Sequence, residues 1–316
     1  MPAVQLSGVV KHFGALHAVD GVDLDIPRGE LFGLIGHNGA GKSTLFKMML
    51  GLLPPTAGEI RVQGQPVSGR GFRSVRRGIG YLPENVVLYD NLSGLETLQF
   101  FGRLKGLPAR GLDATCNEVL DRVGLAYAGQ RAVRGYSKGM RQRLGFAQAL
   151  LGAPQVLFLD EPTNGLDPEA IRGFYATLRA LRDEGVTVVI TSHILAELQE
   201  RVDRLAILAA GRVQAVGSVQ ALRERVALPL RLQLRLATGD AAARAASRSV
   251  VQAVLDSLPL TDGQWRADAE GDSFAARCPR AMKLPALAAL AALGPRLADL
   301  QLIEPSLEDL FFGMSD

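Results

Sequence analysis

The feature that most constrains this chain is a glycine-rich stretch, Gly36 to Ser43, which reads Gly-His-Asn-Gly-Ala-Gly-Lys-Ser. It fits the pattern of Gly, four residues, then Gly-Lys-Ser/Thr, which is typical of loops that cradle phosphates. An apolar run at 31–35 has the length of a strand, and residues 43–50 have a helical pattern. Glycines let backbone N–H groups approach an anion, and the start of a helix favours negative charge. The stretch therefore predicts a triphosphate site on a strand, loop and helix unit.

This loop supplies most of the candidate ATP-binding residues. We expect Lys42 to reach the β- and γ-phosphates and the Ser43 hydroxyl to ligate Mg²⁺. Phe13 has two interpretations, as an ordinary core residue or as the aromatic side chain that stacks on adenine, and the loop that follows favours the second. The candidate ATP-binding residues are Phe13, Gly36, His37, Asn38, Gly39, Ala40, Gly41, Lys42, Ser43 and Thr44.

The length, composition and net charge of the chain limit the class of protein to which it can belong. A chain of 316 residues with 47% hydrophobic content is expected to form two domains. The net charge of +3 comes with no polybasic block, so nucleic acid is not indicated as a partner. Cys116 and Cys278 lie far apart, which fits a reducing compartment. The first ten residues show no secretory signal, and no run approaches the roughly 20 apolar residues that span a bilayer. We therefore expect a cytoplasmic chain, and any membrane crossing would fall to another chain.

Periodicity places the elements of a first domain, residues 1–225. Residues 93–123 have helical spacing and form part of a helical insert at about 90–150, and Ser137 and Pro168 each open a further helix. The expected strands are 4–10, 22–26, 59–62, 79–84, 156–159 and 186–190, with a hairpin from 205–208 and 213–216.

Residues 226–316 are expected to form a second domain with a regulatory or docking role. The predicted order is strand 230–236, helix 245–255, strands 265–269 and 274–277, helix 284–293 and strand 297–303. This β-α-β-β-α-β order is that of a ferredoxin-like α+β module. A short capped helix is expected at 305–312.

Two carboxylates follow the apolar strand at 156–159. Buried carboxylates are costly unless they meet a metal or a partner. Because neighbouring strand residues point to opposite faces, Asp160 and Glu161 cannot share one role. Asp160 fits a Mg²⁺ ligand, and Glu161 fits the base for the attacking water, although the pair could instead cap the following helix. His193, after the strand at 186–190, is either a core histidine or a group that bonds the γ-phosphate and holds the water.

Together these motifs resemble the ATP-binding subunits of ABC transporters over roughly residues 4–225. The matching segments are the 36–43 loop, Tyr-Ser-Lys-Gly-Met-Arg-Gln-Arg at 136–143, Asp-Glu-Pro-Thr at 160–163, Gly-Leu-Asp at 165–167 and Ser192-His193. The resemblance implies an α/β P-loop ABC ATPase domain with a mainly parallel sheet, an antiparallel β subdomain and a helical insert. It also implies an ATPase that turns ATP and water into ADP and phosphate.

The resemblance further implies a homodimer in which each ATP lies between one copy's loop and the other's signature segment. The signature residues that contact ATP in trans are Ser137, Lys138, Gly139 and Met140. Asp167 would join the dimer interface. The segment reads Tyr-Ser-Lys-Gly-Met where the family usually has Leu-Ser-Gly-Gly-Gln, but it keeps the serine and the second glycine. Glu84 stands where the family usually has a glutamine that senses Mg²⁺ and the permease, and it is expected in both roles.

A narrower resemblance is to the NosF ATPases of NosDFY systems, which mature copper nitrous oxide reductase. It rests on segments 80–85, 92–94, 96–98 and 103–106 and on the tail at 305–310. It implies a NosY-like integral membrane permease, a NosD-like periplasmic subunit and a peripheral place on the cytoplasmic face of the inner membrane. The chain itself is not expected to bind copper, because its histidines and cysteines show no ligand spacing.

Three alternatives stay open. The chain could serve another ABC-2 type exporter with the same mechanism. A soluble ABC ATPase acting on ribosomes or DNA would commonly carry two tandem cassettes or a long coiled coil, whereas this chain shows one set of motifs. A regulator that binds nucleotide without turnover is disfavoured by Glu161 and His193.

Overall fold

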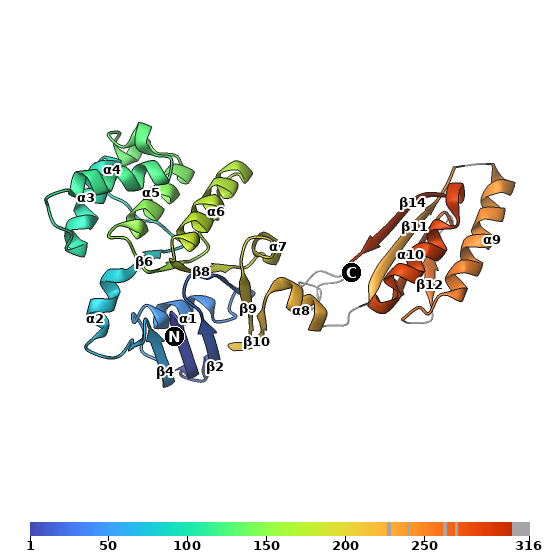
Figure 1. Ribbon diagram of the computed structural model, residues 1–316, viewed down its shortest axis with the longest axis horizontal. Helices are drawn as coiled ribbons and strands as arrows, with labels where there is room; N and C mark the ends of the chain where they lie inside the picture. The colour runs from blue at the N-terminus through green and yellow to red at the C-terminus, as the bar shows by residue number, and fades with distance from the viewer. Residues whose placement is uncertain (226–228, 239, 262–263, 269–270, 305–316) are drawn as a thin grey trace. The chain divides into compact units, whose positions relative to one another are not determined.

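The structure, a computed structural model, describes residues 1–225, 229–238, 240–261, 264–268 and 271–304. The chain divides into two compact units, Met1–Val219 and Gln220–Asp316. The division falls six residues before the expected boundary at 225, at the start of helix α8 (Val219–Arg225). Figure 1 shows both units and labels most of their elements.

An antiparallel sheet forms the N-terminal edge of the first unit, with strand order β2-β1-β4-β5. Its strands are β1 (Val4–Phe13), β2 (Leu16–Ile26), β4 (Ala57–Val62) and the short β5 (Gln65–Pro66). The first two strands are longer than predicted and form one hairpin whose tip contains Gly14. Irregular register after Leu6 breaks the alternation of apolar residues, so the pattern in the sequence ends before the strand does.

A six-stranded sheet, in the order β10-β9-β3-β8-β7-β6, lies at the centre of the unit. Five strands are parallel, and only β10 runs against its neighbour β9. The strands are β3 (Leu31–Ile35), β6 (Ile79–Leu82), β7 (Val156–Leu159), β8 (Thr187–Ser192), β9 (Arg204–Ala209) and β10 (Arg212–Gly217). Every residue of β3, β7 and β8 is buried, as continuous apolar runs predict for a covered parallel sheet.

Helices cover both faces of this sheet (Figure 1). One core packs β3, β7 and the antiparallel sheet against α1 (Lys42–Met49), while the other packs the opposite faces against α3 to α6. The other helices of this unit are α2 (Phe72–Val75), α3 (Gly94–Lys105), α4 (Leu112–Arg122), α5 (Lys138–Leu150), α6 (Pro168–Asp183) and α7 (Leu195–Leu198). The predicted helical insert is therefore α3 to α5.

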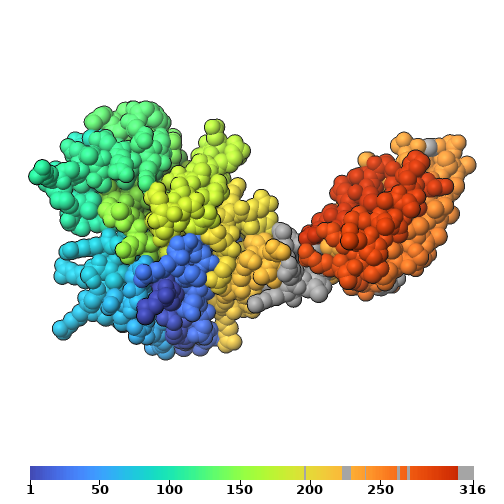
Figure 2. Space-filling view, in the orientation of Figure 1, coloured from blue at the N-terminus to red at the C-terminus, as the bar shows by residue number. Residues whose placement is uncertain are grey.

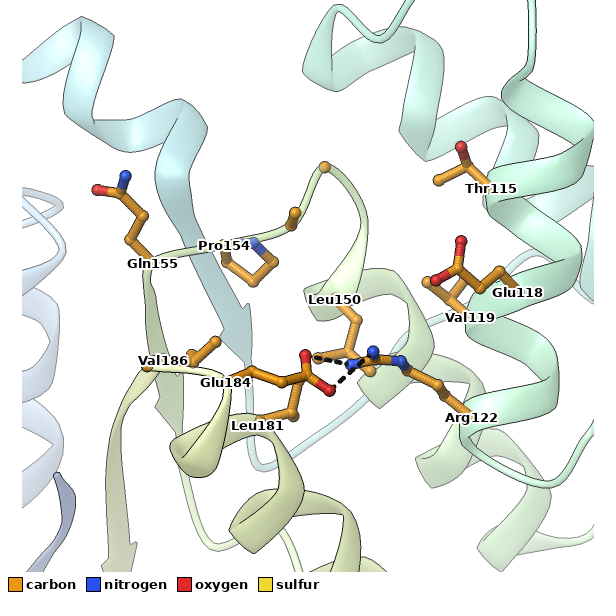
Figure 3. Close-up of a pocket in the computed structure, with 13 residues that line it drawn as sticks. Thr115, Glu118, Val119, Arg122, Leu150, Pro154, Gln155, Leu181, Glu184 and Val186 are labelled. Carbon is orange, nitrogen blue, oxygen red and sulfur yellow. Dashed lines mark hydrogen bonds and ion pairs between the residues drawn. The ribbon is translucent and has the colours of Figure 1, made fainter. Parts of the chain in front are cut away.

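An ion pair joins the helical insert to the end of α6. The Arg122 guanidinium donates to both carboxylate oxygens of Glu184, at 3.0 and 2.9 Å. Figure 3 shows this pair beside a cavity of about 350 Å³ between α4 and the turn after α6.

The second unit has the predicted β-α-β-β-α-β order. Its elements are β11 (Leu230–Leu236), α9 (Ala241–Ser257), β12 (Trp265–Ala267), β13 (Ser273–Cys278), α10 (Lys283–Ala291) and β14 (Leu297–Ile303). The strands pair antiparallel in the order β12-β13-β11-β14, which is the ferredoxin-like arrangement. Both helices pack on one face of the sheet, and Figure 2 shows the unit as a filled body in orange and red. The helix expected at 305–312 lies outside the described residues.

Candidate nucleotide site

A cleft of about 570 Å³ gathers residues from six separate loops of the first unit. The 36–43 loop, Glu84, Glu161 and His193 follow strands β3, β6, β7 and β8. Since these strands are parallel, their carboxyl ends meet at one edge, where ligands of such sheets bind. The hairpin of β1 and β2 supplies Phe13 at the rim.

The glycine-rich loop packs so closely against neighbouring backbone that two of its glycines have no room for a side chain. A Cβ on Gly36 would run into the carbonyl oxygen of Leu208, and one on Gly41 would meet the carbonyl oxygen of Ala18. Gly41 also has φ of +104°, which L side chains rarely adopt. Its neighbours His37, Asn38, Gly39, Ser43 and Thr44 line the cleft at the start of α1. The loop therefore fits a phosphate cradle, as predicted from its sequence.

Lys42 is buried within the cradle. Its ammonium donates to the carbonyl oxygens of Gly36 and His37 and lies 3.7 Å from Oε1 of Glu161. Burial lowers the pKa of Lys42 below its ordinary value, while the carboxylates of Glu161 and Asp160 act in the opposite direction. These two carboxylates therefore help to hold the charge that Lys42 would present to phosphate.

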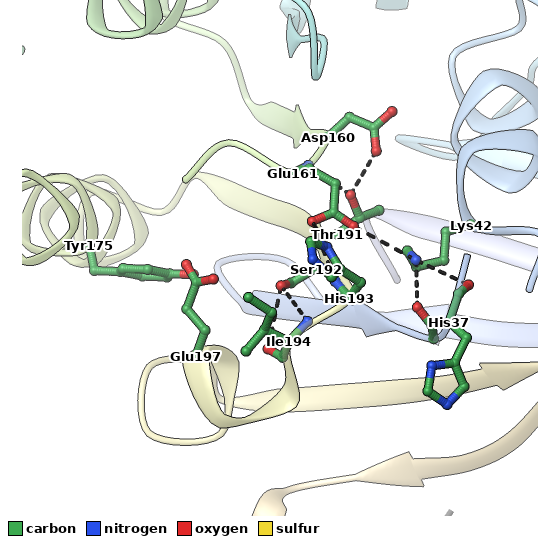
Figure 4. Close-up of polar contacts among 11 residues, drawn as sticks. His37, Lys42, Asp160, Glu161, Tyr175, Thr191, Ser192, His193, Ile194 and Glu197 are labelled. Carbon is green, nitrogen blue, oxygen red and sulfur yellow. Dashed lines mark hydrogen bonds and ion pairs between the residues drawn. The ribbon is translucent and has the colours of Figure 1, made fainter. Parts of the chain in front are cut away.

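Glu161 is fixed between Lys42 and His193 (Figure 4). Its Oε2 lies 2.8 Å from Nδ1 of His193 and accepts a hydrogen bond from the backbone N–H of His193 at 3.3 Å. The backbone of Glu161 has φ of +46°, an unfavourable value for a residue with a side chain, and its N–H donates to Oγ1 of Thr191 at 2.9 Å. This held carboxylate can accept a proton from a water in the cleft.

Asp160 points away from Glu161, on the other side of Thr191 (Figure 4). It is 7% exposed, and its Oδ1 accepts a hydrogen bond from Thr191 Oγ1 at 2.7 Å. Burial raises the pKa of the Asp160 carboxyl above its ordinary value, against the opposing effect of that hydrogen bond. The two side chains do point in different directions, as expected, but strand alternation is not the cause. Strand β7 ends at Leu159, and the left-handed backbone of Glu161 turns its side chain away from that of Asp160.

A metal site is compatible with these donors. Oδ2 of Asp160 has no hydrogen-bond partner among the described residues, and carboxylate and hydroxyl oxygens suit Mg²⁺. Ser43 and Glu84 are exposed and line the cleft, whereas Asp160 lies deeper and does not line it.

Phe13 lies at the end of β1 with 49% of its surface exposed. The ammonium of Lys11 lies 5.3 Å from the centre of its ring. Because Phe13 is exposed and lines the cleft, the structure favours a residue that stacks on adenine over an ordinary core residue.

The signature residues and Asp167 do not line this cleft. Ser137 caps α5, and its hydroxyl accepts a hydrogen bond from the N–H of Met140 at 3.2 Å. Lys138 is exposed and Gly139 is half-buried, but the Met140 side chain packs in the core and is 8% exposed. Asp167 caps α6 by accepting a hydrogen bond from Ala170 N–H at 2.8 Å.

Comparison with known proteins gives the family. A sequence model described as "ABC transporter" matches residues 19–164. The chain is 42% identical over 221 residues to the daunorubicin resistance ATP-binding protein DrrA3 of Streptomyces coeruleorubidus, which covers 70% of each protein. The chain belongs to the ABC transporter family. It is also 32% identical to the linearmycin resistance ATP-binding protein LnrL of Bacillus subtilis (strain 168), over 99% of this chain and 98% of that protein.

A solved structure in the same family resembles the first unit. The ATP-binding cassette MJ0796, described as a dimer in a post-hydrolysis state bound to ADP and Pi, gives a TM-score of 0.63 at 25% identity. The match covers 68% of this chain and 98% of that chain.

Membership of the ABC transporter family confirms the predicted fold class and the predicted ATPase activity. ABC ATPase subunits dimerise and pair with a membrane permease. Within the described ranges of this chain, no helix combines the length and the apolar character that a membrane span needs.

Some residues in and beside the cleft were not predicted from the sequence. Thr191 bonds both Asp160 and Glu161, which only the pairing of β7 with β8 could have indicated. Asn164 and His17 line the cleft. His17 also packs against His12, with ring centres 3.9 Å apart, because the two residues are opposite each other in the hairpin. In the described part of the chain, no group of three or more His, Cys, Asp or Glu side chains could hold a metal ion.

Proposed function

We propose that this chain is the ATP-hydrolysing subunit of an ABC exporter. In this proposal it works as a homodimer with two ATP molecules at its interface and drives an integral membrane permease from the cytoplasmic face of the inner membrane. The observation that carries it is the Glu161 carboxylate, held between Lys42 at 3.7 Å and His193 at 2.8 Å. The relatives DrrA3 and LnrL both carry the word "resistance" in their names, which supports export.

Each group in the cleft has a proposed part in hydrolysis. The loop N–H groups and Lys42 hold the phosphates, and Phe13 stacks on the adenine. Glu161 accepts the proton of the attacking water, a role typically worth about 10²- to 10⁴-fold in rate. His193 orients Glu161 through Oε2 and bonds the γ-phosphate with the ring nitrogen that faces away from Glu161.

Ser43, Asp160 and Glu84 would hold Mg²⁺. The metal supplies positive charge beside the β- and γ-phosphates when it is bound. Asp160 stays ionised beside it, because a cation opposes the effect of burial on the carboxyl.

The second copy would complete the site in trans. Ser137, Lys138 and Gly139 lie at the start of α5, where unpaired N–H groups and the helix dipole favour a phosphate. We propose that they contact the ATP held by the partner copy, with Asp167 beside them in the interface. Met140 would take part through its backbone, since its side chain is buried.

The permease would dock on an exposed apolar patch of Val87, Tyr89, Phe100 and Leu104, which are 86%, 54%, 38% and 69% exposed. The rings of Tyr89 and Phe100 are in contact, with centres 5.5 Å apart. Leu88 packs instead against the core, so it does not join the patch. Exposed apolar side chains that gather on one surface are typical of an interaction site. Glu84 would couple the patch to the cleft, because it lines the cleft three residues before Val87.

Glu161→Gln tests the catalytic assignment. We expect the variant to bind ATP, lose turnover and accumulate as an ATP-bound dimer, because only the base is removed. Light scattering on a sizing column gives the mass, and phosphate release gives the rate. Glu118→Gln is the matched control, since Glu118 is exposed on α4. Unchanged turnover in Glu161→Gln would remove Glu161 from its role.

Capture of partners tests the transporter assignment. Glu161→Gln with ATP is used to pull down proteins from detergent-solubilised membranes of the native host, and they are identified by mass spectrometry. We expect a permease with several spans, and Val87→Asp with Tyr89→Asp should release it while ATP binding persists. Ribosomal proteins without a membrane protein would favour the soluble class of ABC ATPase instead.

The copper assignment is a narrower proposal that the same capture tests. Segments 80–85, 92–94, 96–98 and 103–106 are similar to NosF, which favours maturation of nitrous oxide reductase through NosY-like and NosD-like partners. A periplasmic partner of that system in the pull-down would support it. A different permease would keep the exporter proposal and discard the copper assignment.

A further inference from the structure

The sheet of the second unit has one face without helices. Its helix-covered face packs Leu232, Leu234 and Phe274 against α9 and α10. The residues between them point the other way, and we call this side the open sheet face. Its main members are Arg231 and Arg235 on β11, Arg266 on β12, and Ser273, Ala275 and Arg277 on β13.

Four arginines crowd this face. Arg231 and Arg277 are directly opposite each other on neighbouring strands, a like-charge pairing that destabilises a sheet. Arg235 is opposite Ser273, and Arg266 is opposite Ala275 on the other side of β13. Arg235 and Arg266 therefore flank the part of β13 where the outward side chains, Ser273 and Ala275, are small.

The open sheet face differs from the helix side in how its arginines are paired. Arg244 and Arg248 on α9 both form ion pairs with Asp272, and Arg280 pairs with Glu304. Within the ranges that the structure describes, Arg231, Arg235 and Arg266 form no ion pair. With Arg277 they outnumber the carboxylates of Asp268 and Asp299 on this face, so an excess of positive charge remains there.

A hollow of about 540 Å³ lies on this face, with Arg235 and Arg266 at its sides and Ser273 and Ala275 in its lining. Asp268 and Asp299 also line it, and Asp299 is directly opposite Arg235 in the pairing of β11 with β14. Asp299 accepts a hydrogen bond from Gln301 at 2.9 Å, and Asp268 accepts one from the N–H of Asp272 at 2.8 Å. The hollow therefore has two small lining residues and two arginines without an ion pair among the described residues, and its two carboxylates offset part of their charge.

We propose that the open sheet face binds a phosphorylated anion in this hollow, clamped by Arg235 and Arg266. The planar guanidinium donates two parallel hydrogen bonds to phosphate oxygens, and two such forks on either side of β13 can converge on one ligand. A single-stranded RNA is a poorer fit, because RNA-binding sheets of this topology stack bases on aromatic side chains. The outward residues of β11 and β13 include none.

The phosphate could belong to a soluble phosphate compound or to a lipid headgroup, and the experiment separates the two. The full chain carries Lys42→Ala, so that its glycine-rich loop does not dominate phosphate binding. Calorimetry with pyrophosphate gives the first arm. Sedimentation with vesicles of phosphatidylglycerol, compared with phosphatidylcholine, gives the second.

The decisive comparison is Arg235→Gln with Arg266→Gln against Arg296→Gln, which removes an exposed arginine from the turn before β14. We expect at least 10-fold weaker binding in the double variant and unchanged binding in the control. Arg235→Lys with Arg266→Lys should give an intermediate loss, because charge stays while the fork is removed. Fluorescence of Trp265, the single tryptophan, verifies that the unit is folded.

Binding of pyrophosphate that depends on the two arginines assigns a soluble ligand, and binding only to phosphatidylglycerol vesicles assigns a headgroup. Equal binding by the double variant and the control would overturn the proposal. So would no binding of either probe by the Lys42→Ala chain.

Discussion

Thr191→Val is the most direct test of how Asp160 and Glu161, the carboxylates proposed to act in hydrolysis, are held. Valine has nearly the same shape as threonine and suits a strand, so β8 should keep its packing. The substitution removes only the hydroxyl, which donates to Asp160 at 2.7 Å and accepts from the N–H of Glu161 at 2.9 Å. Asp160 and Glu161 are 7% and 8% exposed, so water replaces the lost bonds poorly.

The magnitude follows from these two bonds. A hydrogen bond to a charged group contributes about 1.5–3 kcal/mol, and one between neutral groups contributes about 0.5–1.5 kcal/mol. We expect the free energy of unfolding to fall by about 2–4.5 kcal/mol, the sum of these two contributions. The left-handed backbone of Glu161 also loses the bond that holds it, so its carboxylate should leave the position between Lys42 and His193. A tenfold loss of rate corresponds to about 1.4 kcal/mol of barrier, and we expect kcat to fall about 10- to 100-fold.

Two assays check this expectation. Urea unfolding followed by circular dichroism gives the stability, with Trp265 fluorescence as a reference for the second unit. Phosphate release gives kcat. Thr191→Ser keeps the hydroxyl and should retain most of both quantities. If Thr191→Val stays within 0.5 kcal/mol and twofold of the wild type, by ordinary error limits, the argument from Thr191 is refuted.

Three further predictions concern charge and burial. Burial raises the pKa of Asp160 above 3.8 in the folded chain, so stability falls as pH rises from the unfolded to the folded pKa and stays low above it. Asp160→Asn should therefore be more stable than wild type at pH 7 without Mg²⁺ and should lose this pH dependence in urea melts. Burial raises the pKa of Cys116 to about 11 and also raises that of Cys278, so native protein at pH 8 should show no reactive thiol, and denatured protein two. A colorimetric thiol assay that finds a reactive thiol in the native chain would contradict the buried placement. The Arg122 and Glu184 side chains are 37% and 49% exposed, and exposed ion pairs contribute little. A double-mutant cycle to alanine should therefore give a coupling energy of about 0.2–1 kcal/mol. A coupling energy above about 2 kcal/mol would contradict this expectation, because it is typical of a pair that is shielded from water.

The parts of the fold that could be predicted are those in which local pattern and burial agree. The runs at 31–35 and 156–159 are buried along their whole length, and their predicted bounds match β3 and β7, whereas β6 ends at Leu82, two residues before the predicted end. In the second unit, strict alternation marks β11 at 230–236 because one face is apolar. Glycine and proline residues between these elements indicated where the elements end.

The remainder depends on contacts between distant segments. The hairpin of β1 and β2 extends beyond its apolar residues because backbone pairing continues it, and that pairing brings His12 to His17. Thr191 meets Asp160 and Glu161 only because β7 and β8 are neighbours. The turn at Glu161 is a backbone conformation that residue type disfavours, so no propensity could indicate it. Sequence motifs indicated that the 36–43 loop and His193 belong to one candidate site, and both line the same cleft, but the contacts that hold Glu161 and Asp160 in place depend on the fold.

The two sheets of this protein should respond very differently to mutation over evolutionary time. In the first unit, β3, β7 and β8 have no exposed position, so almost every substitution there must be accommodated by neighbours on two sides. In the second unit, alternate residues of β11 and β13 face outward and can vary without disturbing the core. In a library of single substitutions, we therefore expect every position of β3, β7 and β8 to tolerate few residue types. Along β11 and β13, every second position should tolerate many. Divergence within the family would then accumulate on the second sheet, where a new binding preference can arise without loss of the fold.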